Sequence, residues 1–322
     1  PLELQFEKIE KLFNAFEVSM EQNAYTEVGR IVKAIADVIG NLKVIIEETR
    51  PIVSLGKSLI PKKEDDIKNI YDKMTREGYN LEYLNIDANI EEANKKIKDI
   101  FGRLNVLNVE DSLFELKTMH DYFDSLYADF DKERYSKKIY EDYSRSILIK
   151  ATKLEKVNNE LYKKIGDIKY SYDLTDDEVS VISEIKDEIM NIRASYDKVV
   201  DIARSKTLAY SKLAREMEII NSRLVKTEEK LNGALKTLGS LKEDELRARE
   251  QLEEIKRILS QTKEKIRSYK LPIVPKNYYV EMSEAMEAIN EHVKELDKRP
   301  ISIKILNLRV DTARDLVLKV YN

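Results

Sequence analysis

Apolar residues recur at every seventh position from Ile182 to Ile266, and this pattern constrains the fold more than any other feature of the chain. The series has one polar member, Glu245, and runs Ile182, Ile189, Tyr196, Ala203, Tyr210, Met217, Leu224, Leu231, Leu238, Glu245, Leu252, Leu259, Ile266. A heptad seam of this length belongs to a helix that packs along partner helices. Thr175 and Glu178 match a capping box at its start. The pattern predicts one helix of about 90 residues, or roughly 135 Å.

A second stripe with the same period predicts another long helix at about 109–172. Its apolar members are Leu116, Met119, Phe123, Leu126, Phe130, Tyr140, Ile147, Leu154, Leu161 and Ile168. Glu133 occupies a position of this repeat but is polar. Asn108 is the expected N-cap, because the acidic Glu110 and Asp111 that follow suit the positive end of a helix.

Shorter helices are predicted on either side of these two. They lie at about 2–20, 25–60, 67–77, 90–104, 276–298 and 302–322. Pro51 and Pro61 are expected to kink or interrupt the second of them, and Gly78 is a suitable residue just beyond a helix end. Leu271–Pro275 is expected to end the long heptad helix. Because the apolar phase is already set at Leu2 and continues to Val320, both ends of the sequence are interpreted as cuts through helices.

A loose similarity between two segments of the sequence predicts a repeated helical unit. Gly78–Leu81, two short helices and Leu107–Val109 correspond loosely to Ser268–Leu271, two short helices and Ile301–Ile303. The period is about 190 residues, and helical units of fixed period usually stack end to end.

The composition favours an all-α chain. Charged residues make up 36% of the sequence, with 56 Lys and Arg against 60 Asp and Glu, while only 8 Gly and 6 Pro are present. This balance is typical of long helices and coiled coils. The net charge of −4 disfavours general nucleic-acid binding, which requires a basic surface. The absence of Cys fits a reducing cytoplasm, and no apolar run reaches the roughly 18 residues that span a bilayer.

No group of residues predicts catalysis, a cofactor or a metal ion. Gly56–Ser58 lacks the first glycine of a phosphate loop, because position 51, five residues before Gly56, is proline. His120 and His292 have no metal-ligand spacing around them, and are interpreted as structural. The pairs Asp65–Asp66 and Asp176–Asp177 fall at helix starts, where carboxylates stabilise the helix dipole. The sequence therefore predicts no catalytic, cofactor-binding or metal residues, and a protein that is not an enzyme.

Two segments leave alternatives open. The tyrosine-rich run from Met119 to Tyr143 favours core packing of a bundle, with a docking patch for a partner helix as the alternative. The segment 131–170 carries 11 Lys and Arg against 7 Asp and Glu. A solvated helix face is the simpler interpretation. The more specific alternative is a segment that binds an acidic peptide or an anionic lipid surface.

Three motifs in the same order resemble the bacterial septation-ring formation regulator EzrA family. Leu241–Glu250 (LKEDELRARE) is similar to that family's L-(R/K)-(K/E)-D-E-x-x-A-R-E stretch. Leu271–Tyr278 (LPIVPKNY) resembles its LPGLPxxY turn, with Ile273 in place of the usual glycine. Gly78–Ile86 (GYNLEYLNI) resembles its EGYxLxHLxI segment. The similarity extends along essentially the entire chain.

The resemblance implies a fold and a function. Family members have one N-terminal membrane-spanning helix and a cytoplasmic region of spectrin-like triple-helical bundles bent into an arc. They bind the tubulin-like division GTPase FtsZ, limit extra rings at the poles and join the mid-cell division machinery. The family's membrane helix is absent from this sequence, and its Gln/Asn/Arg-rich patch is expected beyond residue 322, so no binding residues are transferred to this chain.

The sequence therefore predicts an all-α, elongated rod of spectrin-like antiparallel triple-helical bundles with long shared helices. Three parts are expected: a helical-bundle repeat at 1–130, long antiparallel coiled-coil helices at 131–271, and the start of another short-helix bundle at 272–322. The predicted function is a non-enzymatic scaffold of cell division that partners FtsZ and is anchored in the membrane at the septum, with self-association left open. The alternatives are a coiled-coil arm of a chromosome-organising ATPase or another spectrin-like spacer.

Overall fold

The computed structural model describes residues 1–269 and 274–322, and its regular elements in these ranges are all helical. The prediction of an all-α chain is confirmed. The α-helices are α1 (Leu2–Glu21), α2 (Tyr25–Ser54), α3 (Ile60–Arg76), α4 (Ile86–Asn105), α5 (Ser112–Ser171), α6 (Asp176–Ser205), α7 (Tyr210–Ser268), α8 (Lys276–Asp297) and α9 (Ile303–Tyr321). A π-helical segment η1 (Leu55–Leu59) and a short 3₁₀ helix η2 (Glu82–Leu84) complete the list. Of the predicted stop at Leu271–Pro275, Leu271, Pro272 and Ile273 lie outside the described residues.

The predicted interruptions at Pro51 and Pro61 are wrong, because α2, η1 and α3 form one unbroken helical path. Pro51 lies inside α2. A proline ring clashes with the carbonyl four residues earlier, which for Pro61 belongs to Lys57. The π-helical segment η1 lies at this place, and its wider turn accommodates the proline. A side chain at Gly56 would meet the Phe101 ring at 2.8 Å, so glycine lets α4 pack closely on η1.

The long heptad pattern belongs to two helices and not to one, so the prediction of a single helix of about 90 residues is wrong. The chain turns between α6 and α7, where Lys206 has a φ of 55°. The Lys206 carbonyl accepts a hydrogen bond from Asn80 Nδ2 at 3.1 Å, which holds the turn from outside. Ala209 within the turn is buried. Because the turn contains no Gly or Pro and keeps the heptad phase, the sequence pattern does not reveal it.

Helix ends agree with the predicted capping residues in two of three places. The Thr175 amide donates to Glu178 Oε2 at 2.8 Å and the Glu178 amide donates to Thr175 Oγ1 at 3.3 Å, as in a capping box. Gly78 follows α3 with a φ of 90°. The prediction for Asn108 is wrong, since α5 begins at Ser112 and Asn108 Oδ1 instead accepts from the Glu110 amide within a turn.

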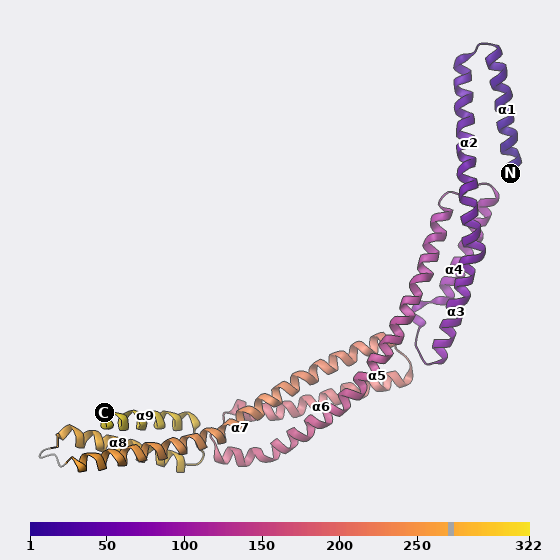
Figure 1. The fold of residues 1–322 in the computed structure, drawn as a ribbon. Helices are drawn as coiled ribbons and strands as arrows, with labels where there is room; N and C mark the ends of the chain where they lie inside the picture. The colour runs from indigo at the N-terminus through magenta and orange to yellow at the C-terminus, as the bar shows by residue number, and fades with distance from the viewer. Residues whose placement is uncertain (270–273) are drawn as a thin grey trace. The chain divides into compact units, whose positions relative to one another are not determined.

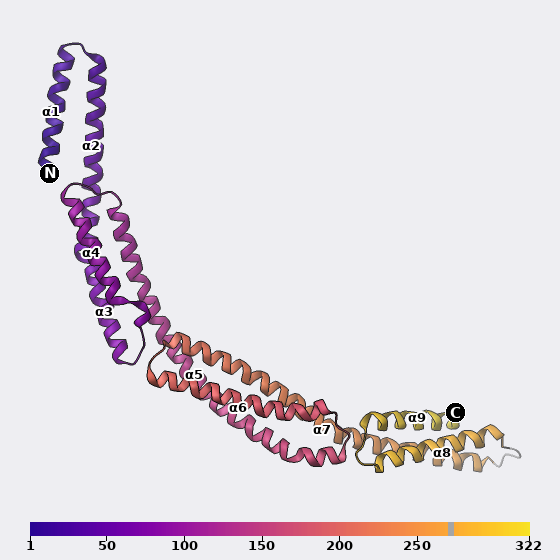
Figure 2. The same ribbon diagram turned by 180° about the vertical axis from the view of Figure 1, so that it is seen from behind.

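The first compact unit comprises Pro1–Tyr140 and Asp201–Arg215. Its main core lies between α3, α4, the end of α2 and the first part of α5, which run side by side in Figures 1 and 2. Fully enclosed side chains of this core include Ile52, Ile60, Ile67, Met74, Ile100, Leu116, Phe123 and Phe130.

The second compact unit comprises Glu141–Val200 and Glu216–Asn322. Within it, α6 runs antiparallel to α5, as contacts between Ser144 and Tyr196 and between Asn158 and Ile182 show. A further core joins the end of α7 to α8 and α9. The predicted division at residues 130 and 271 stays a prediction.

The helix order supports the internal repeat. α4 begins at Ile86 and α8 at Lys276, while α5 begins at Ser112 and α9 at Ile303, so both pairs are offset by about 190 residues.

Replacing Gly233 with alanine is expected to raise the free energy of unfolding by about 1 kcal/mol. The residue lies on the exposed side of α7, and a Cβ there would meet no atom within 4 Å. Chemical denaturation of the variant and of Gly56→Ala, which would collide with Phe101, tests the assignment: the first should stabilise and the second destabilise. A loss of stability in Gly233→Ala would contradict an open helical position.

Candidate functional site: two glutamates at helix junctions

Glu133, the polar member of the α5 stripe, is fully buried and holds two other elements in place. Its Oε1 accepts a hydrogen bond from the Tyr83 hydroxyl at 3.1 Å, and its Oε2 accepts from the Ser211 amide at 3.2 Å. Tyr83 lies in η2, and Ser211 lies in the first turn of α7. The carboxylate therefore acts as an N-cap supplied by a different helix, where the free amides and the helix dipole favour negative charge.

Aromatic side chains surround this junction. The Tyr210 ring lies 5.3 Å from the Tyr79 ring and 5.7 Å from the Tyr140 ring, between centroids. Lys137 Nζ lies 4.6 Å from the centroid of Tyr79 and 5.4 Å from that of Tyr210, at cation–π distance. Burial and the neighbouring Glu133 carboxylate raise the pKa of Tyr83 above its usual value, so its hydroxyl stays a donor.

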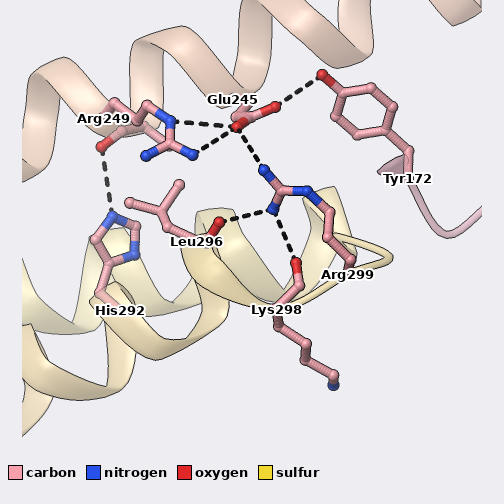
Figure 3. A network of polar contacts seen from close by, with 8 residues as sticks. Tyr172, Glu245, Arg249, His292, Leu296, Lys298 and Arg299 are labelled. Carbon is pink, nitrogen blue, oxygen red and sulfur yellow. Dashed lines mark hydrogen bonds and ion pairs between the residues drawn. The ribbon is translucent and has the colours of Figure 1, made fainter. Parts of the chain in front are cut away.

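Glu245, the polar member of the later heptad series, forms a second junction of this kind on α7. Its Oε2 accepts from the Tyr172 hydroxyl at 2.8 Å, and its Oε1 accepts from Arg249 Nη2 at 2.7 Å (Figure 3). Arg299 Nη2 lies 3.7 Å from the same Oε1, and Arg299 Nη1 donates to the Leu296 carbonyl at 2.8 Å. Burial alone would raise the pKa of Glu245, but the hydrogen bonds from Arg249 and Tyr172 hold it below its usual value.

Backbone pairing reinforces the Glu245 junction. The Asp173 amide donates to the Ile301 carbonyl, and the Ile301 amide donates to the Ser171 carbonyl, each at 2.9 Å. These bonds join the end of α5 to the link between α8 and α9. Burial and the Glu245 carboxylate raise the pKa of Tyr172 to about 12, so the phenol remains protonated and donates.

His292 lies beside the Glu245 network and is fully buried in α8. Its Nε2 faces the Ala248 carbonyl at 3.4 Å, and its Nδ1 has no hydrogen-bond partner among the described residues (Figure 3). Burial lowers the pKa of His292, with a hydrogen bond to Ala248 opposing the shift and Lys256 adding to it. The imidazole is therefore neutral in the folded chain, and its interpretation as structural stays in place.

Acidification is expected to destabilise the chain through His292. Because the folded-state pKa is lowered, the unfolded chain binds a proton first, so stability falls as the pH drops below about 6.5, by at most ~1.4 kcal/mol per pH unit. His292→Gln keeps a donor for the Ala248 carbonyl but does not titrate. Urea unfolding between pH 7.5 and 5.5 should show a shallower pH slope for this variant, and equal slopes would contradict the assignment.

Glu245 contributes in a separate window, because the stability from its lowered pKa is lost below about pH 4.5.

The other histidine, His120, lies with two acids on the exposed side of α5. Ligand atoms of His120, Asp121 and Asp124 all lie within 4.8 Å of one another, a spacing that a metal ion would accept. Lys63 forms an ion pair with Asp124 and lowers the pKa of that carboxyl through a hydrogen bond. A bound ion would have to displace this ammonium group, so the prediction of no metal residues stays as it was.

The tyrosine-rich run on α5 fits both interpretations that its sequence left open, because some of its aromatic side chains lie in the core and others are exposed. Phe123 and Phe130 belong to the core of the first unit, whereas Tyr135 is largely exposed. Gly56–Ser58 lies in the π-helical segment η1.

The two glutamates could be found in the sequence as polar members of apolar heptads. Their partners Tyr83, Tyr172 and Arg299 carried no such signal, because each approaches from a different element.

Both junctions use their carboxylate oxygens in hydrogen bonds to helix-positioning groups. Such an arrangement can fix where one helix ends and another begins. A general acid or base requires an oxygen that is free to exchange a proton with a substrate, and no such group is found at either glutamate.

Comparison with known proteins identifies the family. The family model described as septation ring formation regulator, EzrA, matches residues 1–322. The chain belongs to the EzrA family. The septation ring formation regulator EzrA of Geobacillus sp. (strain WCH70) is 24% identical over 328 residues, covering 99% of this chain and 56% of that protein. The protein of the same name from Listeria monocytogenes serotype 4b (strain CLIP80459) is 19% identical over 306 residues, covering 95% and 54%.

A solved structure agrees with this membership. The cytoplasmic domain of bacterial cell division protein EzrA aligns with a TM-score of 0.67 at 19% identity, covering 97% of this chain and 60% of that one. The EzrA resemblance inferred from three motifs is confirmed, and so is the helical fold. This chain spans about half the length of the curated EzrA relatives. None of its described helices has the length and apolar content needed to cross a membrane.

Proposed function

We propose that this chain is a non-enzymatic scaffold that regulates the septation ring by binding FtsZ and other division proteins. Membership of the EzrA family carries the proposal. The junction geometry supports it, because the Glu133 and Glu245 carboxylates hold structural elements together: Glu133 accepts hydrogen bonds from Tyr83 and the Ser211 amide, and Glu245 from Tyr172 and Arg249.

The proposal includes a place in the cell. The chain would act on the cytoplasmic side, beneath the membrane at the division site, through a membrane anchor in the whole protein. A long helix suits a scaffold, because it holds its two ends far apart. The part of α7 that belongs to the second unit, residues 216–268, is roughly 80 Å long at 1.5 Å per residue.

Co-sedimentation with FtsZ polymers tests the proposal. Purified chain is mixed with FtsZ and GTP, the polymers are pelleted, and bound chain is measured against FtsZ with GDP, which does not pellet. We expect chain to enter the pellet with GTP alone. The complete EzrA protein of the same bacterium serves as the second arm. Absence of binding by both proteins, with normal ring placement after deletion of the gene, would reject the proposal.

A further inference from the structure

The helices α5 and α9 correspond residue by residue within the internal repeat. α9 follows α8 as α5 follows α4 (Figure 1), and both helices bury one series of residues in a constant register. The buried pairs are Leu116 with Val310, Phe123 with Val317, and Leu126 with Val320. The side of α5 that faces the core of the first unit is therefore the side of α9 that faces the core of the second.

The opposite, exposed side of each helix carries the same order of chemical groups. Its members are spaced i, i+4 and i+7, so each set lies on one face of its helix. The same register pairs Phe114 with Leu308, Thr118 with Thr312, and Asp121 with Asp315. The first three on α5 are called the α5 stripe, and their counterparts the α9 stripe. Phe114 is 72% exposed and Leu308 is 65% exposed.

The threonines of the two stripes make the same contact. Thr118 Oγ1 donates a hydrogen bond to the Phe114 carbonyl, and Thr312 Oγ1 donates to the Leu308 carbonyl, each at 2.9 Å. The exposed apolar residue and the threonine therefore form the same local unit on both helices.

The aspartates of the two stripes also have matching surroundings. Asp121 Oδ1 lies 3.7 Å from His120 Nδ1, and Asp315 Oδ1 lies 3.7 Å from Arg314 Nε. Because 3.7 Å exceeds the distance of a hydrogen bond, each of these carboxylate oxygens can still accept from a partner.

The exposure of Phe114 and Leu308 does not depend on which elements surround each helix. In the second unit the end of α5 pairs with the link before α9 through the Ile301 carbonyl and amide, and Leu308 is exposed beside it. In the first unit the start of α7 joins α5 at Glu133, and Phe114 is exposed there too. The position is therefore open in two different surroundings.

The recurrence of the whole stripe is what requires an explanation, since a single exposed apolar side chain is common on folded chains. All six side chains of the two stripes are exposed, so core packing does not account for them. Other exposed positions of the two helices differ, such as Lys117 against Asp311. The stripes are therefore interpreted as one contact surface that occurs twice.

We propose that the α5 stripe and the α9 stripe are two equivalent binding sites for two subunits of one FtsZ polymer, an inference that rests on the proposed function. A surface that recurs along a chain of repeats suits a partner that itself recurs, as the subunits of a polymer do. Each subunit would supply an apolar hollow for Phe114 or Leu308. About 10 Å along the helix it would supply a Lys or Arg for the aspartate of the stripe.

Co-sedimentation with FtsZ polymers in GTP tests the two sites. Phe114→Ala and Leu308→Ala should each raise the apparent dissociation constant about tenfold or more, and by similar amounts, because each variant keeps one site. The double variant should lose binding. The matched control, Ile149→Ala with Leu246→Ala, removes two similarly exposed apolar side chains outside the stripes and should bind as the unaltered chain does. Thermal unfolding checks that every variant keeps its fold.

Unpolymerised FtsZ separates two-site binding from a general loss of affinity. Binding of labelled chain to FtsZ with GDP is measured by fluorescence anisotropy. One subunit occupies one site at a time, so each single variant should weaken this binding only about twofold. The double variant should abolish it.

Several outcomes would overturn the two sites. Polymer binding that survives in the double variant would do so and leave the proposed function standing. An effect of only one single variant, or a control that weakens binding equally, would also overturn them. Absence of binding by the unaltered chain would reject the sites and the proposed function together. If the double variant changes the mass of the chain alone in analytical ultracentrifugation, the stripes bind a second copy instead and the proposal fails.

Discussion

Replacing Glu133 with alanine is expected to lower the free energy of unfolding by about 1–3 kcal/mol, because two partly exposed donors lose their acceptor and a fully buried side chain is truncated. The Tyr83 hydroxyl and the Ser211 amide both bind this carboxylate, and the second belongs to the first turn of α7. An unpaired donor costs roughly 1–3 kcal/mol when it is buried and less where water reaches it, as at the half-exposed Tyr83, and the truncated side chain also leaves a cavity. The loss of buried charge offsets part of this cost.

Chemical denaturation measures this effect, with three further variants as controls. Glu141→Ala removes an exposed carboxylate from the same helix and should change stability by less than about 0.5 kcal/mol. Glu133→Gln keeps one acceptor and should have an intermediate effect. In a double-mutant cycle, Tyr83→Phe should couple to Glu133→Ala, since they share one hydrogen bond. A Glu133→Ala variant as stable as Glu141→Ala would show that the junction contributes nothing.

The second large effect is expected at Phe123, whose removal should destabilise the chain by about 3–5 kcal/mol when it is replaced by alanine. Phe123 is 1% exposed in the core of the first unit. Phe114 lies on the same helix and is 72% exposed, so Phe114→Ala is the matched control and should have little effect. Thermal unfolding of both variants separates the two cases. Equal losses would contradict the assigned orientation of α5.

Helix type and apolar facing could be predicted from the sequence, because the heptad period reports which side of a helix is buried. Phe123, Phe130, Ile182 and Leu224 are buried as their stripes predict. Periodicity says nothing about whether the helix is continuous. The turn at Lys206 keeps the heptad phase and is held by Asn80, which lies far away in the sequence, so no local signal marks it.

The candidate site could be predicted only in part. Glu133 and Glu245 stand out as polar residues in apolar series, and a buried carboxylate requires donors nearby. The donors come from elements that periodicity does not place together: Tyr83 from η2 and Tyr172 from the chain after α5. The interruptions predicted at Pro51 and Pro61 were wrong for a different reason, since here a local signal was present but did not decide the structure. Their local preference is strong, but the π-helical segment beside Pro61 lets the helix continue.

Amide hydrogen exchange along α5 tests most directly whether Glu133 anchors a junction on one continuous helix. In the unaltered chain, amides within a turn of Glu133 should exchange as slowly as those on either side of it. In Glu133→Ala, the first turn of α7 at Tyr210 and Ser211 should become the fastest region to open. Rapid exchange around Glu133 in the unaltered chain, at the rate of a frayed helix end, would contradict the account.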